Sequence, residues 1–282
     1  MLAEVFLQTA LAFLAREVPQ WPRENHCYSC HNNGDAARVL YLGRKLGYNI
    51  PAEALRDTTA WLRKPARWDE IHGAPAASDK NLGRIQFTAA LAEAVQTGAV
   101  RDRTTLRAAA RALATLQRPD GSWQVDTGGL PGAPATYGTG LATYLSRRSL
   151  QVAGTTLFAG PIERATRWLA SAVPQSTLDA AALLLAQPGR ADCRQKLLDS
   201  QTSDGGWGPQ AKMPAEAFDT ALAVLALRGQ GPEAARGRAW LLKMQESDGG
   251  WPETTRPSGL QSYAERISTT AWVVYALLQT AY

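Results

Sequence analysis

The pattern that decides the fold occurs three times, as LATLQRPDGSW (113–123), LLDSQTSDGGW (197–207) and LLKMQESDGGW (241–251). Each copy has a leucine, then Gln, Asp-Gly and Trp at fixed spacing. The aspartates of the three copies are 84 and 44 residues apart, so the first interval is about twice the second. Because self-similarity at a fixed period indicates a repeat architecture, we expect a degenerate copy between them, and residues 167–187 provide one with a shorter loop.

Outward from these copies, each loop lies between two segments rich in Ala, Leu, Arg and Gln, which favour helices. The same arrangement continues toward the N-terminus, at 60–95 and at 11–47. Strand patterns are nearly absent. We therefore predict an all-α fold of six helical hairpins, twelve helices in total, forming a single domain over residues 1–282.

Composition narrows the possible functions. Of 282 residues, 45% are hydrophobic and 20% charged, as in a globular protein with a large core. The net charge is +5, but the basic residues are scattered, so we do not expect nucleic-acid binding. No uninterrupted apolar run is long enough for a transmembrane segment. The apolar first 15 residues include Glu4 and predict an amphipathic helix rather than a signal peptide.

The Gln-Asp-Gly-Trp copies, each near a helix rich in Thr and Ala, resemble the QW repeat of squalene–hopene cyclases and related terpene cyclases. The similarity is strongest over residues 105–282. The scaffold of that family, shared with protein prenyltransferase β-subunits, is an α/α toroid in which six hairpins form an inner and an outer ring. The resemblance therefore implies the (α/α)6 toroid for this chain.

The same resemblance implies that standard cyclisation is lost. Terpene cyclases of this type protonate their substrate with D-x-D-D-T-A, and the corresponding stretch here begins EAFDTA (216–221). Phe218 takes the position of the proton donor, and phenylalanine has no acidic proton. Glu216 and Asp219 remain weak catalytic candidates. The alternative is that both simply favour the positive end of a helix dipole.

A second motif stands outside the repeat. HCYSCHNNG (26–34) contains C-x-x-C-H, the attachment sequence for c-type haem. In that chemistry Cys27 and Cys30 bind the haem covalently and His31 is the proximal iron ligand. The alternative cofactor is zinc, held by Cys27, Cys30 and His31 with His26 or His72, because short cysteine spacing also suits zinc.

The motif is predicted in the loop of the first hairpin, residues 17–34, between a helix ending near Arg16 and one beginning near Asp35. Loops of this kind should gather at one end of a toroid, which would place the haem at the mouth of the central cavity. His72 or Met213, each in a later hairpin loop, is the possible distal ligand.

These observations lead to one main expectation and two alternatives. We expect a monohaem c-type protein outside the cytoplasm, with its leader absent from this sequence, performing electron transfer or haem redox chemistry. Its partner would be a redox protein or an apolar small molecule. The alternatives are a diverged terpenoid-processing enzyme, possibly zinc-dependent, and a catalytically silent toroid that serves as the binding subunit of a larger complex.

Overall fold

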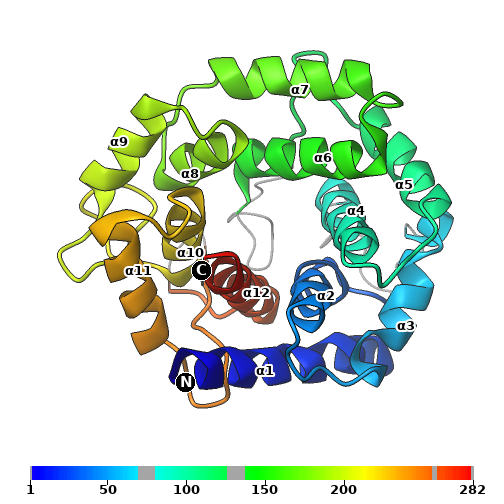
Figure 1. Cartoon of the computed structure of the whole chain (residues 1–282), viewed down its shortest axis with the longest axis horizontal. Coiled ribbons are helices and arrows are strands. Elements are labelled where there is room, and N and C mark those ends of the chain that lie inside the picture. The colour runs from blue at the N-terminus through cyan, green and yellow to red at the C-terminus, as the bar shows by residue number, and fades with distance from the viewer. Residues whose placement is uncertain (1, 69–79, 126–136, 256–258, 281–282) are drawn as a thin grey trace.

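Two concentric rings of helices make up the computed structural model, which describes residues 2–68, 80–125, 137–255 and 259–280. The outer ring contains α1 (Leu2–Asn25), α3 (Glu53–Leu62), α5 (Thr104–Thr115), α7 (Ala159–Ser171), α9 (Ala191–Ser200) and α11 (Gly231–Lys243). The inner ring contains α2 (Ala37–Lys45), α4 (Lys80–Gln96), α6 (Gly138–Gly154), α8 (Thr177–Ala186), α10 (Ala217–Ala226) and α12 (Tyr263–Gln279) (Figure 1). The predicted (α/α)6 toroid is confirmed.

Burial separates the two rings. Every residue of α10 in the inner ring is buried, because the helix is covered by both its ring neighbours and its outer partner. An outer helix such as α5 buries a single stripe spaced three and four residues apart, as a half-covered helix does. That stripe consists of Leu106, Ala109, Ala110 and Leu113. No helix within the described ranges has the length and apolarity needed to cross a bilayer.

The repeated tryptophans form one contact set three times. Trp123, Trp207 and Trp251 are at most 1% exposed. Their indole N–H groups donate to the carbonyls of Leu113, Leu197 and Leu241 at 2.8, 2.7 and 2.7 Å. Their backbone N–H groups donate to the hydroxyls of Thr143, Thr220 and Thr270 at 3.0, 2.8 and 3.0 Å. Each tryptophan thus joins the last part of an outer helix to its inner partner.

The repeated glutamines join one hairpin to the next. Gln117, Gln201 and Gln245 each donate to a glycine carbonyl of their own loop. They also donate to carbonyls on the following outer helix, at Pro161, Glu233 and Phe6, over 2.9, 2.8 and 3.1 Å. Because Phe6 lies on α1, the last of these contacts closes the ring.

The glycine of the repeated Asp-Gly pair is required by the backbone geometry. Gly121 and Gly249 have φ of +98° and +96°, which side chains rarely adopt. A Cβ at these positions would come within 2.5 Å of the Arg164 carbonyl oxygen and 2.6 Å of the Thr9 carbonyl oxygen. Glycine therefore allows each loop to contact the backbone of the next outer helix.

The first hairpin differs from the prediction. Helix α1 does not end near Arg16 but continues to Asn25, although it contains Pro19 and Pro22. Pro22 cannot donate to the carbonyl of Val18, and the side-chain amide of Asn33 donates to that carbonyl instead, at 3.0 Å. The connecting segment is therefore only residues 26–29.

Candidate functional site

The C-x-x-C-H motif leads into a π-helix, η1 (Cys30–Ala36), which continues into α2. The Ser29 hydroxyl caps it by accepting from the backbone N–H of His31 at 3.2 Å. Residues 31–36 are all buried. Because π-helical turns are rare and occur mostly at functional sites, η1 marks this part of the inner ring as a candidate site.

The three residues of the predicted haem site differ in their surroundings. Cys27 and Cys30 are half-buried, whereas His31 is buried. A pocket of about 300 Å³ adjoins Cys27, and Tyr28 stacks on Trp61 in its wall, with ring centroids 4.4 Å apart. Neither Cys30 nor His31 lines this pocket.

His31 instead points to a polar group shared with another hairpin. Its Nδ1 lies 2.7 Å from the hydroxyl of Ser268 on α12. That hydroxyl donates its single proton to Asp35 Oδ2 at 3.0 Å. The contact with His31 must therefore be donated by the imidazole Nδ1–H, which leaves Nε2 with a lone pair. We refer to His31, Ser268 and Asp35 as the polar triad.

Asp35 is the centre of this group and is 1% exposed. Besides the Ser268 hydroxyl, it accepts the Tyr137 hydroxyl at Oδ1 and the Gln86 amide at Oδ2, each at 2.7 Å. The donors come from α4, α12 and the residue that precedes α6. Three hydrogen bonds compensate for the loss of water around a buried carboxylate. They also bring the N-terminal parts of these inner helices together.

Burial shifts the ionisation of two of these groups. It lowers the pKa of His31, and the nearby Asp35 carboxylate opposes that shift only in part. Burial also raises the pKa of Tyr137 well above its ordinary value, and the Asp35 charge adds to the shift. A neutral imidazole and a neutral phenol therefore flank the carboxylate.

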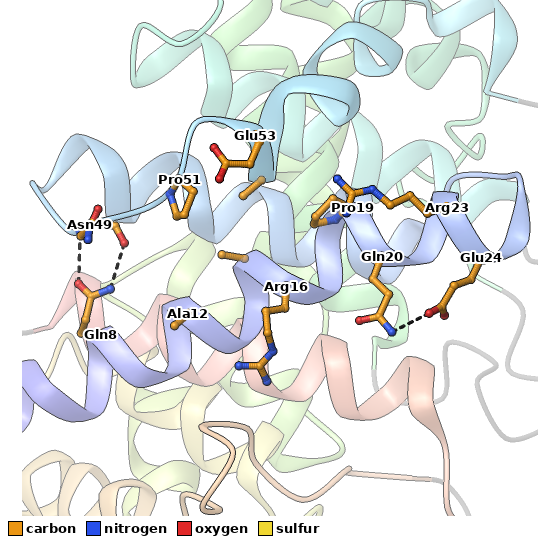
Figure 2. A pocket seen from close by; sticks show the side chains of 12 residues that line it. Gln8, Ala12, Arg16, Pro19, Gln20, Arg23, Glu24, Asn49, Pro51 and Glu53 are labelled. Carbon is orange, nitrogen blue, oxygen red and sulfur yellow. Dashed lines mark hydrogen bonds between the residues drawn. The ribbon is translucent and has the colours of Figure 1, made fainter.

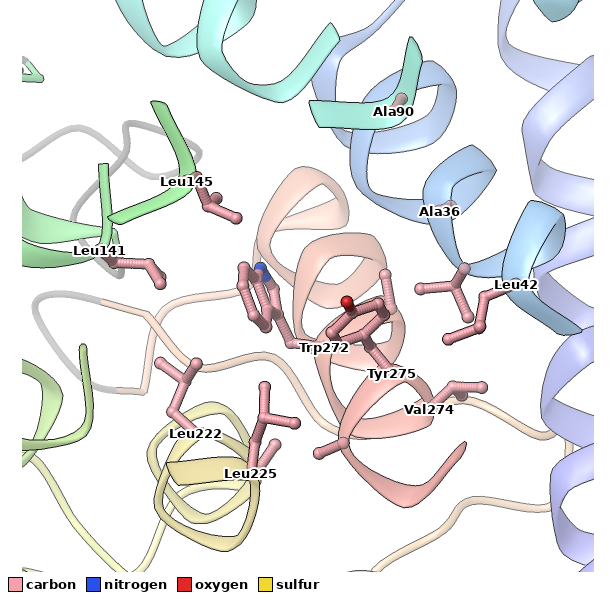
Figure 3. Close-up of a cluster of buried hydrophobic side chains, with 14 of the residues drawn as sticks. Ala36, Leu42, Ala90, Leu141, Leu145, Leu222, Leu225, Trp272, Val274 and Tyr275 are labelled. Atoms are coloured by element: carbon pink, nitrogen blue, oxygen red, sulfur yellow. The ribbon is translucent and has the colours of Figure 1, made fainter. Parts of the chain in front are cut away.

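An aromatic cluster includes Trp272 and Tyr275 (Figure 3). Trp272 and Tyr275 of α12 pack edge to face, with ring centroids 6.0 Å apart. The Arg38 guanidinium lies over both rings, 4.2 and 4.5 Å from their centroids. The Trp272 indole donates to the Tyr137 hydroxyl at 3.3 Å, which links the aromatic cluster to the triad.

The residues aligned with the cyclase motif lie at the start of α10. Glu216 is its N-cap residue and is half-buried, and Asp219 is buried in the first turn. Phe218 is 1% exposed and packs on Tyr137 and Trp272. The position of the family's proton donor is thus part of the aromatic cluster.

Of the two predicted distal ligands, only Met213 lies within the described residues. His72 lies outside the described residues. Met213 is 47% exposed in the connection between α9 and α10, and it does not line the pocket beside Cys27. Over the described ranges, no three His, Cys, Asp or Glu side chains are close enough to hold a metal ion.

A larger groove, of about 770 Å³, lies on the outer surface between α1 and the segment before α3 (Figure 2). Gln8 spans it, with two hydrogen bonds to the backbone of Asn49 at 3.0 and 3.2 Å. Arg16 and Arg23 also line it, but no member of the polar triad does. The groove is therefore separate from the candidate site.

Sequence reasoning missed Asp35, Arg38 and Ser268 as site residues. Asp35 and Arg38 follow the motif by only a few residues, so their nearness to His31 was a usable signal. Ser268 lies 237 residues from His31. It becomes visible only when α12 is placed beside η1.

Comparison with solved structures supports the fold. The type II terpene cyclase MstE from Scytonema aligns with a TM-score of 0.63 at 17% identity, covering 99% of this chain and 98% of that one. A protein from Actinoplanes gives 0.65 at 16%, covering 99% and 100%. A glycosidase variant gives 0.61 at 13%, covering 98% and 97%. No protein-family model and no curated protein matches the chain.

These similarities establish a terpene-cyclase-like and glycosidase-like α/α toroid over the full length of the chain. At such low identity they show the fold alone, and this fold supports more than one chemistry. The function has to be argued from the site.

Proposed function

We propose that this protein is an enzyme that holds an apolar substrate of terpenoid type among its inner helices and acts on it by general acid–base chemistry. The observation that carries the proposal is the polar triad. A buried imidazole held through Nδ1, with its Nε2 lone pair available, is the arrangement of a general base. Similarity in fold agrees with an apolar substrate, since a variant of MstE was solved with geranylgeranyl dihydroxybenzoate.

In the proposed reaction, His31 Nε2 accepts a proton from a substrate C–H or O–H bond, or from a water molecule that attacks the carbonyl carbon of a substrate ester. It then returns that proton to another substrate atom or, when the ester C–O bond breaks, to the departing alkoxide. The resulting imidazolium is stabilised through the Ser268 hydroxyl by the Asp35 carboxylate. A lowered His31 pKa keeps the imidazole unprotonated, and thus ready as a base, at neutral pH.

Two features argue against cyclisation through a carbocation. Phe218 stands where the terpene cyclases place their acid. In addition, the Trp272 and Tyr275 faces that could stabilise a carbocation already carry the Arg38 guanidinium, within 4.5 Å of both ring centroids. A second positive charge beside it would be repelled.

The test is a turnover assay by mass spectrometry with a panel of isoprenoid alcohols, acids and esters. We expect the wild type to convert at least one compound. His31→Gln should lower the rate by a factor of about 100 or more while binding changes little. Binding without conversion would instead support the catalytically silent toroid, and neither binding nor conversion would reject the proposal.

Covalent haem is a second candidate function, and its support is the motif itself. Ser268 orients His31 through Nδ1, as outer-shell partners do for metal-bound histidines. Cys27 adjoins the pocket of about 300 Å³, whose lining includes neither Cys30 nor His31. This proposal also implies maturation outside the cytoplasm.

The haem candidate is tested by producing the chain with an export signal in a host that matures c-type cytochromes. A c-type haemochrome spectrum, lost in Cys27→Ala/Cys30→Ala, would establish it. An unmodified mass of the polypeptide from that host would reject it.

A further inference from the structure

Arg38 is a buried cation whose hydrogen-bonding groups are unused. The side chain is 1% exposed. In the described part of the chain, none of Nε, Nη1 and Nη2 has a hydrogen-bond partner. Burying a charge in this way is strongly unfavourable unless something pairs with it. We propose that Arg38 binds the anionic head group, a carboxylate or a phosphate, of an otherwise apolar ligand; this deepens the proposed function and rests on it.

A second arginine at the Tyr275 ring has the partners that a buried guanidinium usually has. Arg148 donates to the Tyr275 hydroxyl at 2.7 Å and pairs with the Glu93 carboxylate at 3.3 Å. It also donates to the Gln96 side chain. Arg38 lies over the same Tyr275 ring and has none of these partners. The contrast indicates that the fold satisfies a buried arginine where its role is structural.

Asp35 does not neutralise Arg38 directly, although the two are three residues apart. Its oxygens accept from Tyr137, Gln86 and Ser268. No ion pair within 4.0 Å joins the two groups among the described salt bridges. The guanidinium therefore keeps its N–H groups for another acceptor. A planar guanidinium placed on aromatic faces suits bidentate pairing with carboxylate or phosphate.

Apolar side chains near Trp272, the other ring under the Arg38 guanidinium, suit the rest of such a ligand. Leu141 and Leu145 of α6 and Leu222 and Leu225 of α10 surround Trp272 (Figure 3). They are at most 8% exposed. A charged head at Arg38 would leave a hydrocarbon tail beside these leucines, so the site favours amphipathic ligands over neutral ones.

The experiment compares three ligands with one tail, farnesol, farnesoate and farnesyl monophosphate, for binding to the full chain by equilibrium dialysis. We expect both anions to bind about 10- to 100-fold more tightly than farnesol, since bonds to charged groups are worth that factor. The tighter anion identifies the head group. Arg38→Met should remove the preference and leave farnesol binding within about twofold.

The outcomes are distinguishable. Equal binding of all three compounds would overturn the role of Arg38 and leave the proposed function standing, whereas binding of none would reject both. Arg38→Met should melt at or above the wild-type temperature, because it removes an unpaired buried charge. Strong destabilisation would assign Arg38 a structural role and overturn the inference. If Arg38→Met does not fold, Arg38→Lys is the second variant. It keeps the positive charge but not the planar guanidinium that pairs with two oxygens, so it should reduce the preference for the anions over farnesol.

Discussion

The loop that joins an outer helix to its inner partner is built differently in the first hairpin and in the three hairpins that carry the repeated tryptophan. In the former, Gln, Asp-Gly and Trp repeat the same hydrogen bonds three times, all within the loop or to the nearest helices. In the first hairpin, C-x-x-C-H and a π-helix replace them. Its polar side chains bond across the inner ring, from Asp35 to Tyr137 and from His31 to Ser268. The repeated loop residues stabilise the scaffold, whereas the candidate site is formed by residues of the first hairpin that do not repeat.

The largest expected effect is on the scaffold. Trp207→Ala removes a fully buried indole and leaves the Leu197 carbonyl without its donor. We expect it to lower the free energy of unfolding by about 3–5 kcal/mol, measured by urea denaturation. Cys27→Ala, in the half-buried first connection, is the comparison and should cost less than about 1 kcal/mol. A similar cost for both would make the motif part of the scaffold.

A smaller effect is expected in the polar triad. Asp35→Asn replaces an acceptor oxygen with an amide and disturbs hydrogen bonds from Tyr137, Gln86 and Ser268. It should destabilise the fold by about 1–3 kcal/mol and abolish any turnover. Ser268→Ala is the matched variant, with the smaller loss of stability. Turnover by the Asp35→Asn variant would show that the polar triad does not take part in the reaction.

The glutamine contacts between hairpins come next. Gln201→Leu and Gln245→Leu each remove two hydrogen bonds, so each should cost about 1–2 kcal/mol by thermal or urea unfolding. Equal losses in the free energy of unfolding would show that the contact that closes the ring is worth as much as the other contacts between hairpins. A clearly larger loss for Gln245→Leu would show that closure depends on this single contact.

The smallest effect is a pH dependence from His31. Its pKa when folded lies below the unfolded value of about 6.5, so between the two values the unfolded state binds more protons. The free energy of unfolding should therefore be constant above that range and decrease as the pH falls through it, by at most about 1.4 kcal/mol per pH unit. His31→Gln should flatten this dependence. An unchanged slope would mean that other groups cause it.

The sequence predicted the architecture better than the site. The spacing of Gln, Asp-Gly and Trp was enough to predict six hairpins. The predicted end of α1 near Arg16 was wrong, because the helix continues through Pro19 and Pro22 to Asn25. The amide of Asn33 that compensates for Pro22 belongs to another element. The roles of Asp35 and Arg38 depend on α12 lying beside η1, a proximity that no local pattern encodes.

The contacts of Gln245 and Gly249 with α1 have a consequence for how the molecule unfolds. Open repeat arrays have terminal units with a bare side, which fray first unless a special cap covers them. Here the last hairpin serves as the neighbour of the first, so no unit has a bare side. Melting should therefore be a single cooperative event, with hydrogen exchange spread evenly around the ring rather than graded from either terminus.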